Sequence, residues 1–168
     1  MDVFEAIRTL LAVRRYDDMP VPEASVRRIL EAGRLTGSAK NAQPWHFVVV
    51  QSRDTLQQLG AMSRSGSYIA QAPLAIVVVV DRTEFAVSDA SRAFQSMLLA
   101  AWEDGLGSNW VGFFKLEAAR PLLGIPDDVD IFAILPFGYP AQEVGLGKKE
   151  RRALAEVAHR ERWEQPFE

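Results

Sequence analysis

The sequence contains no cysteine, and its 168 residues include two histidines. The absence of cysteine excludes disulfides, thiolate nucleophiles, iron–sulfur clusters and thiolate zinc sites. The two histidines, His46 and His159, lie far apart in the chain and neither has a partner histidine at helical spacing, so a structural metal is not expected. Any redox chemistry in this chain must therefore come from a bound cofactor.

The chain also lacks an excess of positive charge and a long apolar run. Its 19 basic and 22 acidic residues give a net charge of -3, so no overall positive field favours nucleic acid or an anionic membrane. The longest apolar run, Ala72 to Val80, is less than half of the roughly 20 residues that a membrane helix needs. The first residues are acidic, unlike a signal peptide. We expect a cytoplasmic protein that binds neither nucleic acid nor membrane.

Hydrophobic spacing predicts both helices and strands. The length and the 48% hydrophobic composition fit one folded domain over residues 1–168. Helices are expected over 2–13, from about 22 to 33, and over 56–62, 88–104, 116–123 and 154–157, and strands over 47–51, 74–80, 110–114 and 131–137. The run 74–80 does not alternate, so both of its faces should be covered. The sequence predicts an α+β domain whose sheet is covered by helices.

Common nucleotide and hydrolase motifs are missing. Gly105, Gly107 and Gly112 do not have the dinucleotide-binding spacing, and they follow a predicted helix instead of a strand. The lysine at position 148 lacks both the upstream glycine and the following hydroxyl of a phosphate-binding loop. No serine has glycines two residues away on both sides, as the nucleophile of many hydrolases does.

Three polar segments are hard to explain by packing alone. They are Arg14-Arg15-Tyr16 after the first helix, Ser38 to Trp45 before a strand, and Lys149 to Arg152 near the carboxyl end. Together with Pro20-Val21-Pro22, Gly105 to Ser108 and Phe137 to Pro140, they resemble the FMN-dependent nitroreductase family. The pattern S-x-x-N-x-Q-P-W from Ser38 to Trp45 is the most specific part of the resemblance.

The resemblance implies a fold, an assembly and a reaction. The fold is an α/β/α layered one, in which helices cover both faces of a mixed, largely antiparallel sheet. The assembly is a homodimer with FMN between the subunits, and the C-terminal segment from about 145 to 168 embraces the partner. The reaction passes electrons from NAD(P)H, a transient donor, to a small-molecule acceptor such as a nitroaromatic or quinone by a ping-pong route. Because the flavin carries the chemistry, no catalytic side chain is expected.

The resemblance also assigns cofactor contacts, residue by residue. Arg15, Lys149 and Arg151 should hold the phosphate, and Arg14 should lie near the pyrimidine edge of the flavin. Ser38 and Asn41 of the neighbouring subunit should offer hydroxyl and amide groups. Val111 and Gly112 match the segment whose backbone amide faces the flavin nitrogen that accepts hydride. Ser65, Tyr68 and Phe113 are expected to line the substrate space.

One departure from the family pattern leaves alternatives open. The usual phosphate-binding R-R-S falls on Leu10, Leu11 and Ala12 here, which implies weaker FMN binding or a different flavin-like cofactor unless Arg15, Lys149 and Arg151 compensate. The alternatives are a specialised relative that dehalogenates its substrate or degrades flavin, and a flavin-binding or structural dimer without efficient turnover. The natural acceptor and the choice between NADH and NADPH are not evident from the sequence.

Overall fold

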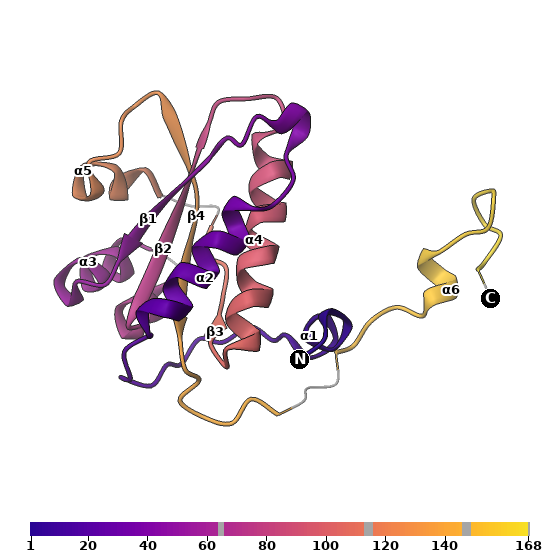
Figure 1. The fold of residues 1–168 in the computed structure, drawn as a ribbon, viewed down its shortest axis with the longest axis horizontal. Helices are drawn as coiled ribbons and strands as arrows, with labels where there is room; N and C mark the ends of the chain where they lie inside the picture. Colours follow the sequence, from indigo (N-terminus) through magenta and orange to yellow (C-terminus); the bar gives the residue numbers. More distant parts are fainter. Residues whose placement is uncertain (64–65, 113–115, 146–148, 168) are drawn as a thin grey trace.

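A four-stranded antiparallel sheet forms the centre of the molecule (Figure 1). The computed structural model describes residues 1–63, 66–112, 116–145 and 149–167. The strands are β1 (Trp45–Val50), β2 (Leu74–Asp81), β3 (Gly107–Ser108) and β4 (Val129–Gly138), in the order β1-β2-β4-β3. Every adjacent pair is antiparallel. The expected α+β class with a largely antiparallel sheet is confirmed.

Helices cover both faces of this sheet. On one face lie α2 (Glu23–Arg34) and α4 (Ala86–Glu103), and on the other lie α3 (Arg53–Met62) and α5 (Ala119–Leu123) (Figure 1). The short helices α1 (Val3–Thr9) and α6 (Leu154–Val157) and the 3-10 turns η1 (Ala39–Asn41), η2 (Ser67–Gln71) and η3 (Leu116–Ala118) complete the described elements. The predicted helices at 22–33, 88–104 and 154–157 are confirmed to within a few residues.

Strand β2 explains the unbroken apolar run of the sequence. Ile76 and Val78 pack toward α2 and α4, while Val77 and Val79 pack toward α3 and α5. Successive side chains of a strand point to opposite faces, so a strand covered on both sides needs apolar residues at every position. The sheet is therefore packed between two apolar layers. Ala86 and Ala101, near the two ends of α4, both belong to the layer on the α2 and α4 face.

Two predicted boundaries are wrong for the same reason. The helix expected over 2–13 ends at Thr9, and the chain continues extended because Val13 N–H donates to Ser108 O (2.9 Å). Of the strand expected over 110–114, residues 113 and 114 lie outside the described residues; the described part forms only an isolated bridge between Val111 and Ile134, and the strand of this region is β3, a few residues earlier. In both places long-range backbone hydrogen bonds override the local pattern.

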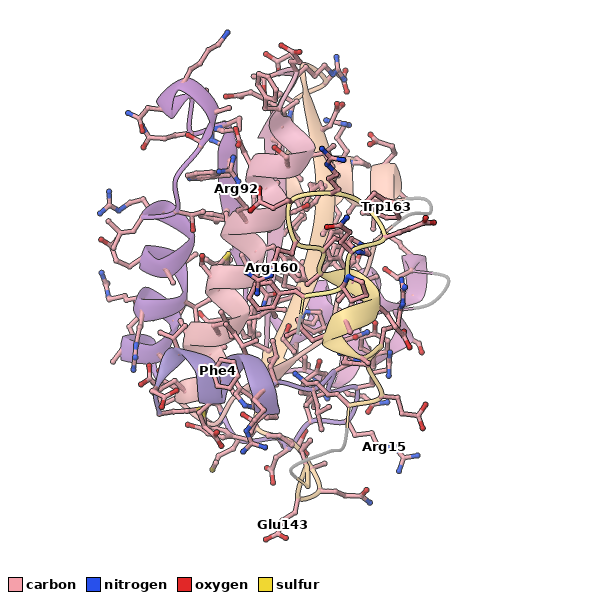
Figure 2. All side chains as sticks on the ribbon, turned by 90° about the vertical axis from the view of Figure 1, so that its right-hand side faces the viewer. Phe4, Arg15, Arg92, Glu143, Arg160 and Trp163 are labelled. Carbon is pink, nitrogen blue, oxygen red and sulfur yellow. The ribbon has the colours of Figure 1, made fainter. Side chains whose placement is uncertain are left out.

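The C-terminal segment leaves the body of the molecule. Residues 149–167 start beside α1, extend away from the sheet and carry α6 at a distance from it (Figure 1). Apolar side chains on this arm are exposed, among them Leu154 at 62% and Trp163 at 79%. Figure 2 shows Trp163 and Arg160 on the arm, in front of the body. Within the described ranges, no helix is long and apolar enough to cross a membrane.

Candidate functional site

Residues 12–17 form an extended segment along one end of the sheet. Besides the bond from Val13 to Ser108, Asp17 N–H donates to Tyr139 O (2.8 Å) and Arg15 O accepts from Ala141 N–H (3.1 Å). The Tyr16 hydroxyl donates to Val13 O (2.7 Å), and burial raises the pKa of this phenol, which stays protonated. These bonds fix the backbone of the segment.

The fixed backbone holds two arginines outward. Val13 and Tyr16 are buried, whereas Arg14 and Arg15 between them are exposed. Arg15 extends from the body into solvent in Figure 2. Within the described part of the chain, neither guanidinium has an acidic partner within ion-pair distance.

A glycine of β3 allows this segment to approach the sheet. A Cβ added to Gly107 would lie 2.3 Å from Cγ2 of Val13, far closer than van der Waals contact. A residue with a side chain at this position would therefore push the arginine-bearing segment away. The glycine-containing stretch from 105 to 108 thus has a packing role that its sequence does not disclose.

Lys149 and Arg151 belong to the same end of the molecule. Lys149 Nζ donates to Ile7 O (2.6 Å) in the last turn of α1. Burial and, secondarily, the nearby positive charge of Arg151 lower the pKa of Lys149. Arg152, in contrast, points to Glu156 (3.2 Å) on α6. In the described structure Lys149 and Arg151 form no ion pair, so they, like Arg14 and Arg15, have no acidic partner there, which is a typical setting for binding an anion.

The segment from Ser38 to Gln43 is a tightly built loop at the other end of α4. Lys40, Asn41 and Gln43 have positive φ values of 52°, 56° and 48°, a region that residues other than glycine rarely adopt. Ser38 Oγ accepts from Gln43 N–H (2.9 Å), which leaves the hydroxyl proton available to another acceptor. The Asn41 side chain is exposed. The loop therefore presents both expected polar groups in a defined shape.

Asp89, which the sequence analysis did not single out, bonds to this loop. Its side chain is fully buried, at 0% exposure, and its two oxygens accept from Ala39 N–H at 3.1 and 3.2 Å. It also pairs with Arg92. The signal was an acidic residue next to Ala90, inside the apolar stripe of a helix, where a charge is rarely buried without a partner.

Backbone hydrogen bonds near position 111 distinguish the two residues expected to contact the flavin, Val111 and Gly112. Val111 N–H donates to Ile134 O (3.0 Å), so its amide is already used. No hydrogen bond of the Gly112 N–H is found among the described residues. A Cβ on Gly112 would lie 2.1 Å from Nε1 of Trp110, so only glycine fits there. Of the two expected residues, Gly112 has the available amide.

Tyr68 lies beside this backbone. Its hydroxyl accepts from the Asn109 side-chain amide and donates to Trp110 O (3.4 Å). Gly66 packs the adjacent turn closely, because an added Cβ would be 2.6 Å from Cγ1 of Val111. The other residues expected to line the substrate space, Ser65 and Phe113, lie outside the described residues.

A hollow of about 850 Å³ is lined in part by Trp110. Its lining is mainly apolar and includes Ala86, Leu116 and Phe132, with Arg82 and Asp130 at its polar part. None of the expected cofactor residues that the structure describes lines this hollow. It therefore does not define the cofactor site by itself.

Two groups of the expected residues are attached to opposite ends of α4. Asp89 in the first turns of α4 contacts the loop at Ala39, and Trp102 in its last turn donates to Thr9 Oγ1 of α1. At roughly 1.5 Å of rise per residue, these two contacts are about 20 Å apart along the helix. Ser38 and Asn41 are therefore not near Arg14 and Lys149 within one chain.

Comparisons with known proteins agree on one family. The model of the nitroreductase family matches residues 8–81 and 64–139. A relative from Methanothermobacter thermautotrophicus, named as an NADH dehydrogenase/NAD(P)H nitroreductase, is 40% identical over 154 residues, which cover 86% of this chain and 81% of the relative.

Solved structures are similar over nearly the whole chain. A nitroreductase from Desulfovibrio desulfuricans in complex with FMN has a TM-score of 0.86 and 35% identity, with 100% of this chain and 99% of that chain covered. An FMN-dependent nitroreductase from Clostridium difficile has a TM-score of 0.86 and 26% identity, with 96% and 100% covered. The similarity thus includes both ends of α4 and the segments attached to them.

Proposed function

This chain belongs to the nitroreductase family, and from that premise we propose that it is an FMN-dependent oxidoreductase that uses NAD(P)H to reduce nitroaromatics, quinones or similar acceptors. The observation that carries the proposal is that four cations expected to contact FMN, Arg14, Arg15, Lys149 and Arg151, have no acidic partner among the described residues. These residues come from opposite ends of the sequence. A bound anion is the simplest reason to keep cations at these positions without acidic partners.

The donor set fits a phosphate monoester. A guanidinium binds phosphate oxygens in a bidentate manner, and each charge-assisted hydrogen bond contributes about 1.5 to 3 kcal/mol. Lys149 donates one N–H to Ile7 O and retains two further N–H donors. We assign Arg15, Lys149 and Arg151 to the phosphate of FMN. Arg15 and Arg151 are exposed and Lys149 is half-buried, so all three remain accessible to it.

The remaining groups suit the flavin ring. Arg14 would stabilise negative charge at the pyrimidine edge, and the Gly112 amide, which makes no hydrogen bond among the described residues, would face the flavin nitrogen that accepts hydride. FMN, when bound, supplies the hydride and electron transfer itself. The protein accordingly needs no acidic side chain near the ring. Tyr68 would border the acceptor space through its contacts with Asn109 and Trp110.

The separation along α4 supports a homodimer. If Ser38 and Asn41 contact the same FMN as Arg14, they must come from a second chain, because about 20 Å of helix separates the two groups within one chain. The exposed apolar side chains of the C-terminal arm suit a partner surface. We propose that residues 1–168 form one domain, that the segment 145–168 embraces the partner, and that the dimer works in the cytoplasm.

The phosphate-binding R-R-S of the family pattern is replaced here by Leu10, Leu11 and Ala12, which changes how the phosphate would be held. Leu10 is the C-cap of α1, and Leu10 and Leu11 are half-buried. Neither leucine nor Ala12 offers a side-chain donor to phosphate. The phosphate is then held from one side, by Arg15 and by the two cations of the C-terminal arm. This arrangement makes FMN retention depend on the arm.

The proposal is tested first by the identity of the cofactor. Purified protein should be a yellow dimer, and mass spectrometry of the molecule released by heat should identify FMN. Either NADH or NADPH should be oxidised with a nitroaromatic or quinone acceptor, and initial rates at several acceptor concentrations should give the parallel lines of a ping-pong reaction. A colourless monomer that does not take up added FMN would overturn the proposal.

A matched pair of arginine variants tests the phosphate assignment. Arg151→Ala should raise the dissociation constant for FMN by about tenfold, the equivalent of one charge-assisted contact. Arg152→Ala removes the adjacent arginine, which pairs with Glu156 on the arm, and should leave FMN affinity unchanged. Fluorescence titration of the apoprotein with FMN measures both. Equal effects of the two variants would contradict the assignment of Arg151.

A further inference from the structure

Asp89 joins a buried carboxylate to the loop that carries Ser38 and Asn41. Its side chain comes from the first turns of α4, is 0% exposed, and accepts from the backbone N–H of Ala39 with both oxygens, at 3.1 and 3.2 Å. Ala39 begins the turn η1, directly after Ser38. The carboxylate therefore ties the first residue of the turn to α4, a helix that packs in the hydrophobic core.

The loop needs such an anchor because its backbone is strained. Three of its six residues, Lys40, Asn41 and Gln43, have positive φ values and none of them is glycine. Such conformations persist where surrounding contacts determine them, and they gather at binding sites. Within the loop the contacts are local: Asn41 N–H donates to Ser38 O (3.1 Å) and Gln43 N–H to Ser38 Oγ (2.9 Å). The bond to Asp89 connects this local structure to the core.

The carboxylate has no comparable role within α4. The N-cap of α4 is Phe85, and no side-chain cap bond is made there. Arg92, one turn further along the helix, balances the charge of Asp89 from a half-exposed position. Burying a carboxylate is unfavourable unless it is paired and hydrogen-bonded, and this one is satisfied by Arg92 and by the loop. The hydrogen bonds from the loop are thus the second interaction that compensates for burying the Asp89 carboxylate.

We propose that Asp89 is a positioning residue, whose carboxylate holds the loop 38–43 in the shape that presents Ser38 and Asn41 to FMN bound by the partner subunit. The inference rests on the proposed function for the FMN, but its first part concerns the loop alone. Without the anchor, the strained loop should populate other conformations. The affinity for FMN then falls by the fraction of molecules that remain competent to bind.

The first experiment measures the loop in the apoprotein. Hydrogen exchange followed by mass spectrometry should show amides of residues 36–44 exchanging at least about tenfold faster in Asp89→Ala, since the loop opens locally. Met97→Ala is the matched control, because Met97 is a fully buried residue of the same helix and packs against Gly33, away from the loop. Faster exchange in the loop by the same factor in both variants would mean general destabilisation and would overturn the proposal.

The second experiment measures FMN affinity of the same proteins by fluorescence titration. Asp89→Ala should raise the dissociation constant by about thirtyfold, if about one molecule in thirty keeps the competent loop. Asp89→Asn keeps an oxygen acceptor for Ala39 N–H and should restore both loop protection and affinity to within about threefold of wild type. Met97→Ala should bind FMN as wild type does once folded.

The two experiments separate the two proposals. If wild-type protein binds no FMN, the proposed function fails, while the exchange data still report whether Asp89 anchors the loop. If Asp89→Ala loosens the loop and FMN affinity is unchanged, the positioning role is overturned and the cofactor assignment stands. Rescue by Asp89→Asn in both measurements supports the positioning role, and no rescue in either overturns it.

Discussion

The two ends of α4 carry two kinds of binding surface. The loop 38–43 is built in advance, with a buried carboxylate, internal hydrogen bonds and three strained residues that define its shape. The cationic set consists of Arg14, Arg15, Lys149 and Arg151, and none of these side chains has an acidic partner among the described residues. The difference shows that one half of the proposed site has a conformation fixed by its own contacts, whereas the other half contributes positive charge that a bound anion would neutralise.

The largest effect is expected from breaking the geometry under the cationic set. Gly107→Ala places a Cβ 2.3 Å from Val13 Cγ2, so the segment that carries Arg14 and Arg15 must move. Overpacking of this kind costs about 2 kcal/mol, which lowers the melting temperature by about 6 °C in a chain of this size. FMN affinity should fall by more than about tenfold, because both arginines shift with Val13. Thermal unfolding and FMN titration measure the two effects.

Gly37→Ala is the control for this change. No atom of the described residues lies within 4 Å of a Cβ at Gly37, which directly precedes the loop 38–43. Its melting temperature and FMN affinity should match those of wild type. If Gly107→Ala also binds FMN normally, the cationic set does not depend on its backbone, and the contrast between the two ends of α4 is weaker than stated.

The same contrast explains which parts of the fold could be predicted from sequence. Strand β2 and helix α4 are predictable because burial imposes an unbroken run on one and a 3.6-residue period on the other. The end of α1 and the region around Val111 are not, because hydrogen bonds to Ser108 and Ile134, far away in sequence, decide them. Local patterns carry no information about such partners.

The candidate site divides in a similar way. The motif residues from Ser38 to Trp45 could be identified by resemblance, but the positive φ values of Lys40 and Gln43 have no signature in residue type. The resemblance named Val111 and Gly112 together, whereas the structure shows that the Val111 amide already bonds to Ile134. Asp89 could not be identified from the sequence, because its partner, Ala39 N–H, is a backbone group that no sequence motif indicates.

A second prediction adds a positive charge at the end of α1, where the cationic set is expected to bind phosphate. Leu10→Arg restores a cation at a position where the family pattern has one, at the half-exposed C-cap of α1. FMN should bind about tenfold more tightly, the gain of roughly one charge-assisted hydrogen bond, and the affinity should become more sensitive to salt. Leu10→Met is the matched control of similar size without charge. Unchanged affinity in Leu10→Arg would place the phosphate away from the end of α1.

The smallest effect is expected from the charge of one lysine. Burial, together with Arg151, lowers the pKa of Lys149, so its ammonium loses a proton at a lower pH than an ordinary lysine. A phosphate binds the protonated form better, so the dissociation constant for FMN should rise as pH increases through this lowered pKa, with a slope of at most one proton. The shift in the free protein also means that FMN binding in this range takes up a proton.

Lys149→Arg tests the assignment of this pH dependence. An arginine stays charged over the whole range, so the rise in the dissociation constant between neutral pH and the ordinary lysine pKa should disappear in the variant. Any titration of FMN itself is common to both proteins and cancels in the comparison. A pH profile that is identical in wild type and variant would mean that Lys149 serves only to bond Ile7 O at the end of α1, and that the charge stored at this end of α4 resides in the three arginines.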